Sequence, residues 1–320
     1  MDPSDRETAG PIERHPGRRA REGLDIVNLL TVPEEADGQR LDRFTADQAR
    51  EFPSRKAAYK AAKNERILLN GQPAPPHTRV RNGDTIAVRA PTALHAPLAL
   101  PLEIHMQDES IAVITKPPGI PTSGNYARTV ARALPANLTP SPRADALPAP
   151  HPVHRLDSPT GGLLLIAKTA TAAMELGRQF EQRLVRKRYR AIVAGRMHPP
   201  EGALTTPVGN REAHTDYRVV AVTPSLSVGD LSLVDLFPKT GRTHQLRSQL
   251  ADAGYPIIGD KTYHANRKVL RGKGLFLWAA GLTFIHPQTK QKIHCNTPEP
   301  PKFNAYIERE MRRAREKCET

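Results

Sequence analysis

The segment His154-Arg-Leu-Asp-Ser-Pro-Thr-Gly-Gly-Leu-Leu-Leu-Ile-Ala167 joins a charged loop to a short apolar run. The run from Gly162 to Ala167 is typical of a buried strand. Asp157 lies in the loop before it, next to Arg155 and His154, which can both carry positive charge. We therefore expect a carboxylate in a positive field, with a pKa that stays low. The alternative is that Asp157 only stabilises a turn and pairs with Arg155 at the surface.

Further apolar segments surround this strand and indicate a sheet with helices packed on it. The patterns predict strands at 111–114, 189–193 and 231–237, and helices at 172–184 and 243–254. Phe303, Tyr306, Ile307 and Met311 recur at helical spacing near the C-terminus, which predicts an amphipathic helix there. Because the predicted strands outnumber the helices, we expect an α+β fold with a mixed, largely antiparallel sheet.

The remaining sequence predicts two domains within the 320 residues. Residues 1–30 mix both charge signs with Pro and Gly, which indicates a flexible tail. Residues 31–90 contain two helical segments, strands at 67–69 and 85–88, and two Asn-Gly turns, which together predict a small α+β module. The proline-rich stretch 91–101 predicts a linker, and residues 102–320 then form the larger domain.

The charge balance points to an anionic partner, because 47 Lys+Arg stand against 33 Asp+Glu for a net charge of +14. That partner is a nucleic acid, an acidic protein or an anionic membrane surface. Arg55, Lys56 and Lys60 follow Ser54, a good N-cap, so basic side chains and free backbone N–H groups would lie together and suit phosphate. The alternative is an ordinary solvated helix face.

Several classes of protein are disfavoured by what the sequence lacks. Two cysteines form no disulfide framework or paired zinc motif, and His286, His294 and Cys295 lack metal-ligand spacing, so we expect no metal. No apolar run approaches the roughly 18 residues of a membrane span, and the start lacks the apolar core of a signal peptide, so we expect a cytoplasmic protein. The segment 254–262 resembles a phosphate-binding loop, but Asp260 would repel the phosphate.

Two more segments carry candidate site residues. In Lys239-Thr-Gly-Arg-Thr-His-Gln-Leu-Arg247, Gly241 allows a turn from which Arg242 can project into a site, although a phosphate-contacting or solvent-facing arginine fits equally well. Tyr189 follows the basic run Arg186-Lys-Arg188. Its ring could stack on a base and its hydroxyl pKa could be lowered toward that of a general base, while the plain alternative is a packed core tyrosine.

These motifs occur in an order that resembles the RluA-type pseudouridine synthases. The resemblance rests on Lys116-Pro-Pro-Gly119, His154-Arg-Leu-Asp157 with Thr160 to Leu165, Lys187-Arg-Tyr189, Gly241 to Arg247 and Gly254 to Asp260. Residues 40–43 and 67–71 are similar to an S4-like RNA-binding domain. The resemblance implies a pseudouridine synthase fold and isomerisation of specific uridines in ribosomal or transfer RNA. It also implies that no cofactor or metal is needed and that the protein acts as a monomer.

The resemblance also implies roles for individual residues. Asp157 would be the catalytic carboxylate, Tyr189 the ring beneath the flipped uracil and the base for the C5 proton, and Arg242 the ion-pair partner of Asp157. Four more residues are implied to bind the substrate: Arg155, which would displace the target base from the stack, His154, Thr160 and Leu246. The RNA-binding residues of the S4-like module would be Arg55, Lys56 and Lys60.

Two other functions compete with this interpretation. A non-catalytic RNA-binding or ribosome-assembly factor on the same scaffold would show the same charge and the same S4-like module. A glycoside or nucleoside hydrolase would need a second carboxylate as a general acid, for which Asp260 is the candidate. Asp157, Tyr189 and Arg242 together favour the synthase.

Overall fold

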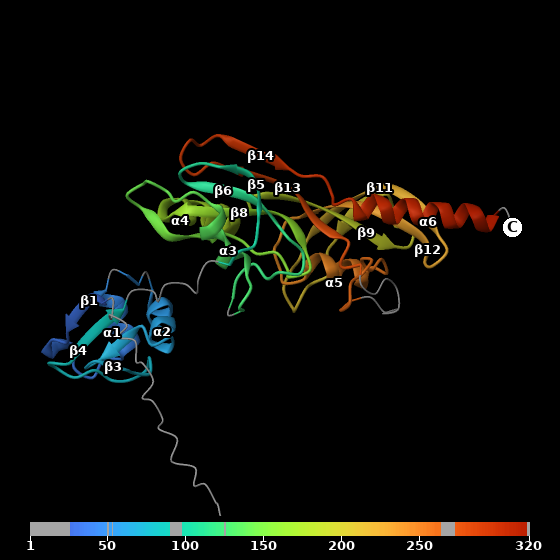
Figure 1. Ribbon diagram of the computed structural model, residues 1–320. Coiled ribbons are helices and arrows are strands. Elements are labelled where there is room, and N and C mark those ends of the chain that lie inside the picture. The colour runs from blue at the N-terminus through green and yellow to red at the C-terminus, as the bar shows by residue number, and fades with distance from the viewer. Residues whose placement is uncertain are drawn as a thin grey trace, which may run out of the picture. The chain divides into compact units, whose positions relative to one another are not determined.

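The computed structural model describes residues 26–49, 51–52, 54–89, 98–124, 126–263 and 273–318. The chain forms two compact units, Met1–Leu94 and His95–Thr320 (Figure 1). The boundary between the units falls in the stretch 91–101, where the sequence predicts a linker. Residues 91–97 of that stretch and residues 1–25 of the predicted tail lie outside the described residues.

The N-terminal unit is a four-stranded antiparallel sheet in the order β1-β4-β2-β3, with two helices packed on it. The strands are β1 (Ile26–Thr31), β2 (Ile67–Leu69), β3 (Gln72–Pro73) and β4 (Thr85–Arg89), and the helices are α1 (Leu41–Gln48) and α2 (Arg55–Lys63). A short 3-10 turn, Glu34–Ala36, follows β1. Leu41, Phe44 and Ile67 are fully or almost fully buried in its core. Two helices on a small sheet match the α+β module predicted for this part of the chain.

One boundary prediction is wrong, because residues 26–30 belong to β1 and not to a tail. The strand pairs with β4, with a shift in register between Ile26 and Asn28, and directs Leu30 toward the core. Its outer residues Ile26, Val27 and Leu29 are exposed. An edge strand that buries so little of its own surface gives a weak sequence signal, especially beside a charged segment.

Helix α2 begins as predicted at Ser54, whose hydroxyl accepts a hydrogen bond from the backbone N–H of Ala57 at 3.3 Å. Ala58, Ala61 and Ala62 are buried against the sheet. The opposite face of the helix is exposed to solvent, and its larger residues there are Arg55, Lys56, Tyr59, Lys60 and Lys63. This face is the basic surface that the sequence predicts.

The C-terminal unit is built on a large sheet with the order β10-β11-β12-β9-β13-β8-β6-β5, to which β14 adds at β13 and β7 at β8. Its pairings are antiparallel apart from the parallel pair β8 and β13. The prediction of a mixed, largely antiparallel sheet is therefore confirmed. The strands are β5 (Glu103–Gln107), β6 (Ile111–Lys116), β7 (Ala146–Pro152), β8 (Gly161–Thr169), β9 (Arg186–Ala194), β10 (Glu201–Leu204), β11 (Thr215–Ser225), β12 (Gly229–Pro238), β13 (Leu277–Ile285) and β14 (Lys292–Asn296).

The parallel pair depends on a glycine beside the Asp157 loop. Gly162 lies opposite Ala279 and has a φ of +114°, in the left-handed region. A Cβ at this position would lie 2.3 Å from the carbonyl oxygen of Ala279, which is backbone and cannot move aside cheaply. Gly162 therefore lets β8 approach β13, and this approach fixes where the loop before β8 emerges from the sheet.

In the described part of this unit, four helices pack on the large sheet: α3 (Val130–Asn137), α4 (Ala170–Glu181), α5 (Gln245–Asp252) and α6 (Lys302–Cys318). Figure 1 shows α6 running beside β11. Buried Glu310 holds α6 there, because its carboxylate accepts hydrogen bonds from Ser225 at 2.6 Å and Ser227 at 3.2 Å. The helices predicted at 172–184, at 243–254 and near the C-terminus are all present, with ends shifted by a few residues.

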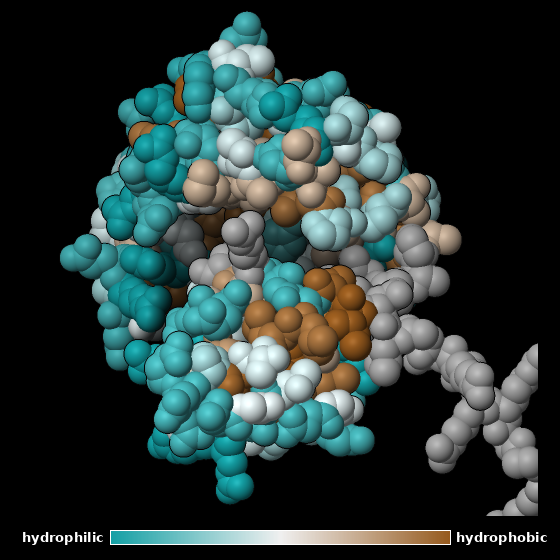
Figure 2. Space-filling view, turned by 90° about the vertical axis from the view of Figure 1, so that its left-hand side faces the viewer, coloured by the Kyte–Doolittle hydropathy of each residue, from teal (hydrophilic) through white to brown (hydrophobic). Residues whose placement is uncertain are grey.

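Within the described residues no helix is long and apolar enough to span a membrane. Figure 2 shows a face of the molecule that is mostly hydrophilic, with a patch of hydrophobic residues among the polar ones.

Candidate active site

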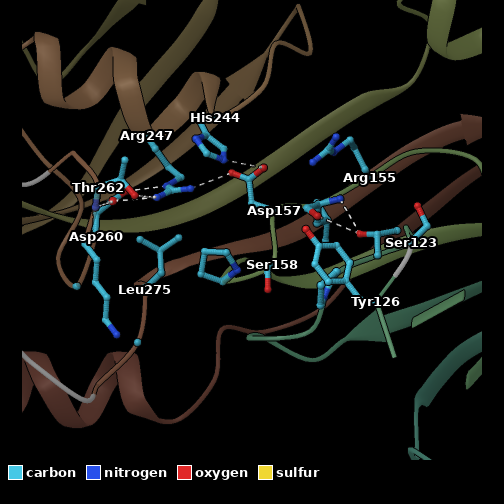
Figure 3. Close-up of a pocket in the computed structure, with 17 residues that line it drawn as sticks. Ser123, Tyr126, Arg155, Asp157, Ser158, His244, Arg247, Asp260, Thr262 and Leu275 are labelled. Atoms are coloured by element: carbon cyan, nitrogen blue, oxygen red, sulfur yellow. Dashed lines mark hydrogen bonds and ion pairs between the residues drawn. The ribbon is translucent and has the colours of Figure 1, made fainter. Parts of the chain in front are cut away.

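Backbone hydrogen bonds shape the loop that carries Asp157. The N–H of Thr160 donates to the carbonyl of Asp157 at 3.0 Å, which turns the chain into β8. Leu156 is fixed from the other side by Thr122, whose hydroxyl donates to the Leu156 carbonyl at 3.0 Å and accepts from its N–H at 3.1 Å. The Asp157 side chain is only 16% exposed and points into the site (Figure 3). A loop restrained in this way holds a carboxylate in one place.

Lys116, at the end of β6, joins two loops of the site. Its buried amine donates to the carbonyls of Pro117 at 2.8 Å, Ile120 at 2.7 Å and Ser158 at 3.1 Å. Burial lowers the pKa of Lys116 to about 8, although the nearby Asp157 carboxylate favours the charged form. In the sequence, Lys116 stands out only as the first residue of the Lys116-Pro-Pro-Gly119 motif, because a hydrogen-bond partner 42 residues away leaves no local signal.

Arg247, in the first turns of α5, connects two carboxylates. Its Nη1 lies 3.4 Å from Oδ2 of Asp157, while its Nε and Nη2 bind Asp260 at 2.7 and 2.9 Å (Figure 3). Burial disfavours the charged form of Arg247, but the hydrogen bond and charge of Asp260 outweigh it, so the pKa of Arg247 is raised. The guanidinium is therefore a fixed positive charge beside Asp157.

Asp260 is the anchor of this arrangement. Its carboxylate also accepts the backbone N–H groups of Thr262 at 2.8 Å and Tyr263 at 3.1 Å. Burial alone would raise the pKa of Asp260, but Arg247 and these N–H groups lower it below the usual range. An ionised, doubly bound carboxylate is unsuited to serve as a general acid, which removes the basis of the hydrolase alternative.

The predicted ion pair between Arg242 and Asp157 is wrong. Arg242 Nε donates to the carbonyl of Glu212 at 3.0 Å, and the arginine that pairs with Asp157 is Arg247. Helix α5 begins after His244, which has a φ of +57°, so Arg247 is the arginine that the first turns direct inward. Both arginines belong to one motif, and spacing alone could not choose between them.

His244 is a further residue of the site, for which the sequence predicts no role. Its Nε2 lies 3.9 Å from Oδ1 of Asp157, and its Nδ1 lies 3.1 Å from the hydroxyl of Tyr263. The left-handed backbone of His244 places the ring between these two groups. The sequence feature that could have pointed to His244 is its position in the same motif as Arg242 and Arg247.

Asp157 lies between two cavities, of about 690 and 280 Å³. The larger is lined on one side by Tyr126 and Arg155 and on the other by Arg247 and Thr262 (Figure 3). The smaller contains Asp157 and all the other residues that the sequence predicts for catalysis and substrate binding: Tyr189, Arg242, Arg155, His154, Thr160 and Leu246. The structure therefore brings these residues together, whereas Arg55, Lys56 and Lys60 belong to the N-terminal unit.

Tyr189, on β9, has the opposite pKa shift to the one expected. Burial raises the pKa of its hydroxyl, and the charge of Asp157 raises it further. The reason lies in the alternation along β9: Arg188 and Arg190 face away and bind Asp235 at 3.3 and 3.0 Å. These two arginines of the basic run therefore supply no positive charge next to the Tyr189 hydroxyl.

His154 is neutral, and the expectation that it can be a cation beside Asp157 is wrong. Its Nε2 accepts the backbone N–H of Leu165 at 3.0 Å, and its ring stacks on Phe180 with centroids 4.8 Å apart. Burial lowers the pKa of His154 to about 3.

Among the residues described, no three His, Cys, Asp or Glu side chains gather into a group that could hold a metal.

Comparison with known proteins agrees with this site. The family described as RNA pseudouridylate synthase matches residues 110–252, which contain Asp157, Tyr189 and Arg247. An uncharacterized RNA pseudouridine synthase of Bacillus subtilis is 30% identical over 295 residues, covering 87% of this chain and 96% of its own. A ribosomal large subunit pseudouridine synthase D of Nitrosomonas europaea is 31% identical over 307 residues, covering 87% of this chain and 86% of its own.

Among solved structures, human RNA pseudouridylate synthase domain containing 4 is similar, with a TM-score of 0.52 and 25% identity over 66% of this chain and 93% of that one. The fold, the sequence relatives and the residues around Asp157 lead to one conclusion. The chain belongs to the RluA family of RNA pseudouridine synthases, enzymes that isomerise uridine in RNA to pseudouridine.

Proposed function

We propose that this enzyme modifies uridines of large-subunit ribosomal RNA in the cytoplasm, as a monomer and without a cofactor, and that Asp157 is its catalytic carboxylate. The observation that carries the proposal is the position of Asp157 between the two cavities, next to the fixed charge of Arg247. The choice of RNA is supported by relatives that are named as ribosomal large subunit synthases and match most of the chain.

The reaction breaks the C–N glycosidic bond, turns the uracil while it is held, joins C5 to the ribose and then removes the C5 proton. An ionised Asp157 can attack the sugar or the base ring, or remove a sugar proton. Arg247 orients the carboxylate, because its Nη1 donates a hydrogen bond of 3.4 Å to Oδ2 of Asp157. Because a base inside a helix is out of reach, the target uridine has to be flipped out, at a cost of a few kcal/mol.

Tyr189 is the proposed platform under the flipped uracil and the base for the C5 proton. Stacking on an aromatic ring offsets part of the cost of flipping. Because its pKa is raised, the hydroxyl can accept the C5 proton only if it passes its own proton to a carboxylate. Asp157 is the carboxylate whose charge acts on Tyr189, so we propose that it takes this proton.

The Tyr189→Phe variant separates the two roles. We expect RNA affinity to change little, because the stacking surface remains, and pseudouridine release to slow by roughly 100-fold, because the C5 proton loses its acceptor. Single-turnover assays with separate measurement of glycosidic cleavage and final product test this. Wild-type rates of both steps would reduce Tyr189 to a stacking platform.

The N-terminal unit is proposed to dock the RNA through the exposed face of α2. Lys56, Lys60 and Lys63 are exposed there, and Tyr59, which is 43% exposed, lies among them. An aromatic ring between basic side chains suits stacking together with phosphate contacts. Arg55 has a second task, because its Nε binds the buried Asp42 at 3.2 Å.

A triple variant with alanine at Lys56, Lys60 and Lys63 tests this docking surface. Each lysine that contacts a phosphate releases about one counterion, so the slope of log affinity against log salt should flatten by up to roughly 3. Alanine at Arg312, Arg315 and Lys317, which are exposed on α6, removes the same charge elsewhere. Equal slopes for the two triple variants would show that only net charge matters, and would contradict the docking role.

The substrate is tested by mapping pseudouridines in total RNA from cells with and without the gene. We expect the loss of pseudouridine at one or more large-subunit positions, restored by the wild-type gene and not by Asp157→Asn. Loss in transfer RNA alone would overturn the choice of RNA and leave the reaction intact. No loss at any uridine would contradict the proposed function as a whole.

A further inference from the structure

A third cavity, of about 390 Å³, adjoins the cavity that contains Tyr189 and is lined by basic side chains. The two cavities share Lys187 and Arg242, so they form one continuous surface. Arg183 and Lys239 line the outer part, where Glu181 is the one carboxylate among the lining residues that the structure describes. Lys239 is already paired with Asp216 at 2.9 Å. The charge that is free to meet a ligand therefore comes from Arg183, Lys187 and Arg242.

Lys187 is the residue that faces both cavities. It lies two positions before Tyr189 on β9, and alternate residues of a strand share a face, so Lys187 and Tyr189 point to the same side of the sheet. Two residues of a strand span about 7 Å. A group bound by Lys187 therefore lies about one nucleotide or less from a base held on Tyr189.

The amine of Lys187 is half-buried and poorly compensated. It donates one long hydrogen bond, of 3.4 Å, to the carbonyl of Thr240. Within the described residues no carboxylate lies within 4.0 Å of it, in contrast to Lys239. Burial lowers the pKa of Lys187, which is the direction expected for an ammonium group without an anionic partner. Such a group is costly to keep in a protein unless a ligand supplies the missing negative charge.

We propose that Lys187 binds a backbone phosphate next to the target uridine, and that Arg183 and Arg242 line the path by which the RNA strand leaves the active site. The proposal rests on the proposed function, since it takes the cavity of Tyr189 as the site of the flipped uracil. A phosphodiester is the anion that an RNA substrate brings to this place, and lysine binds phosphate as a point charge. The contact positions the strand and takes no part in the bond changes.

The first test compares Lys187→Met, which removes the charge at similar length, with Lys187→Arg, which keeps it. The substrate is a stem-loop that carries the mapped uridine, assayed under single-turnover conditions. We expect Lys187→Met to raise the half-saturating enzyme concentration about tenfold, as for loss of a charge-assisted hydrogen bond, and to flatten the salt slope by about 1. The rate at saturation should fall far less, and Lys187→Arg should restore most of the affinity.

The second test identifies the phosphate. Neutral methylphosphonate linkages replace the phosphates around the target uridine one at a time. At one linkage the wild type should lose about tenfold in affinity while Lys187→Met loses little, because the charge that it would contact is already missing. Lys292→Met, on the exposed side of β14 and outside these cavities, should behave as the wild type at every linkage.

The possible outcomes separate this inference from the proposed function. If Lys187→Met binds the stem-loop as tightly as the wild type, or weakens binding equally at all linkages, Lys187 is not a phosphate ligand even though the enzyme is active. A lowered melting temperature with an unchanged salt slope would assign Lys187 the structural task of supporting Thr240. If the wild type forms no pseudouridine in any RNA, the proposed function fails, and affinity for a short oligouridylate still tests Lys187 without turnover.

Discussion

Pseudouridine formation should fall by roughly 1000-fold or more in the Asp157→Asn variant, with little change in RNA affinity. Asparagine keeps the size of the side chain but can neither attack as an anion nor accept a proton. The fold should persist, because Arg247 remains bound by Asp260 at 2.7 and 2.9 Å when Asp157 loses its charge. We therefore expect a melting temperature close to that of the wild type.

The measurement is a single-turnover assay with direct detection of pseudouridine in the RNA, together with an equilibrium binding assay. Asp252→Asn, an exposed residue at the end of α5, is the matched control and should leave both the rate and the affinity unchanged. Substantial turnover by Asp157→Asn on the mapped uridine would show that the carboxylate is not the catalytic group.

The fold could be predicted from the sequence where the hydrophobic pattern of a single segment identifies a helix or a strand. The apolar run of β8 and the amphipathic spacing of α6 show in the residues themselves. The parallel contact of β8 with β13 could not be predicted, because it joins Gly162 to a strand more than 100 residues later and depends on the missing Cβ. Strand β1 was also not predicted. Three of its six residues are apolar but exposed, so the strand lacks the alternation of buried apolar and exposed polar residues.

The site was predicted to the level of motifs but not of contacts. Asp157 and Tyr189 line one cavity, as their motifs predict. The predicted lowering of the Tyr189 pKa is wrong, because alternation along β9 sends Arg188 and Arg190 to Asp235, while burial and the charge of Asp157 raise the pKa of the hydroxyl. Motif spacing shows which residues are close along the chain. The pKa of a side chain depends instead on its burial and on the charged groups that lie near it in the folded protein.

The choice between Arg242 and Arg247 leads to the second large effect, which we expect from Arg247→Met. The variant leaves the carboxylate of Asp260 buried without its bidentate partner, so the free energy of unfolding should fall by about 3–5 kcal/mol. Activity should be lost as well, because Asp157 loses the guanidinium at 3.4 Å. Within the described residues, Arg242→Met breaks one side-chain hydrogen bond, to the Glu212 carbonyl, so the free energy of unfolding should change by about 1 kcal/mol or less.

A double variant separates the structural task of Arg247 from its proposed positioning of Asp157. Arg247→Met with Asp260→Leu removes both buried charges, and replacing a buried ion pair by apolar residues is often close to neutral for stability. We therefore expect chemical denaturation to show most of the lost stability recovered, with pseudouridine formation still absent, because nothing replaces the positive charge beside Asp157. If activity returned together with stability, Arg247 would act only by holding the fold. If Arg242→Met instead lost activity while it kept RNA affinity, Arg242 would be the partner of Asp157 in the RNA complex, as the motif first suggested.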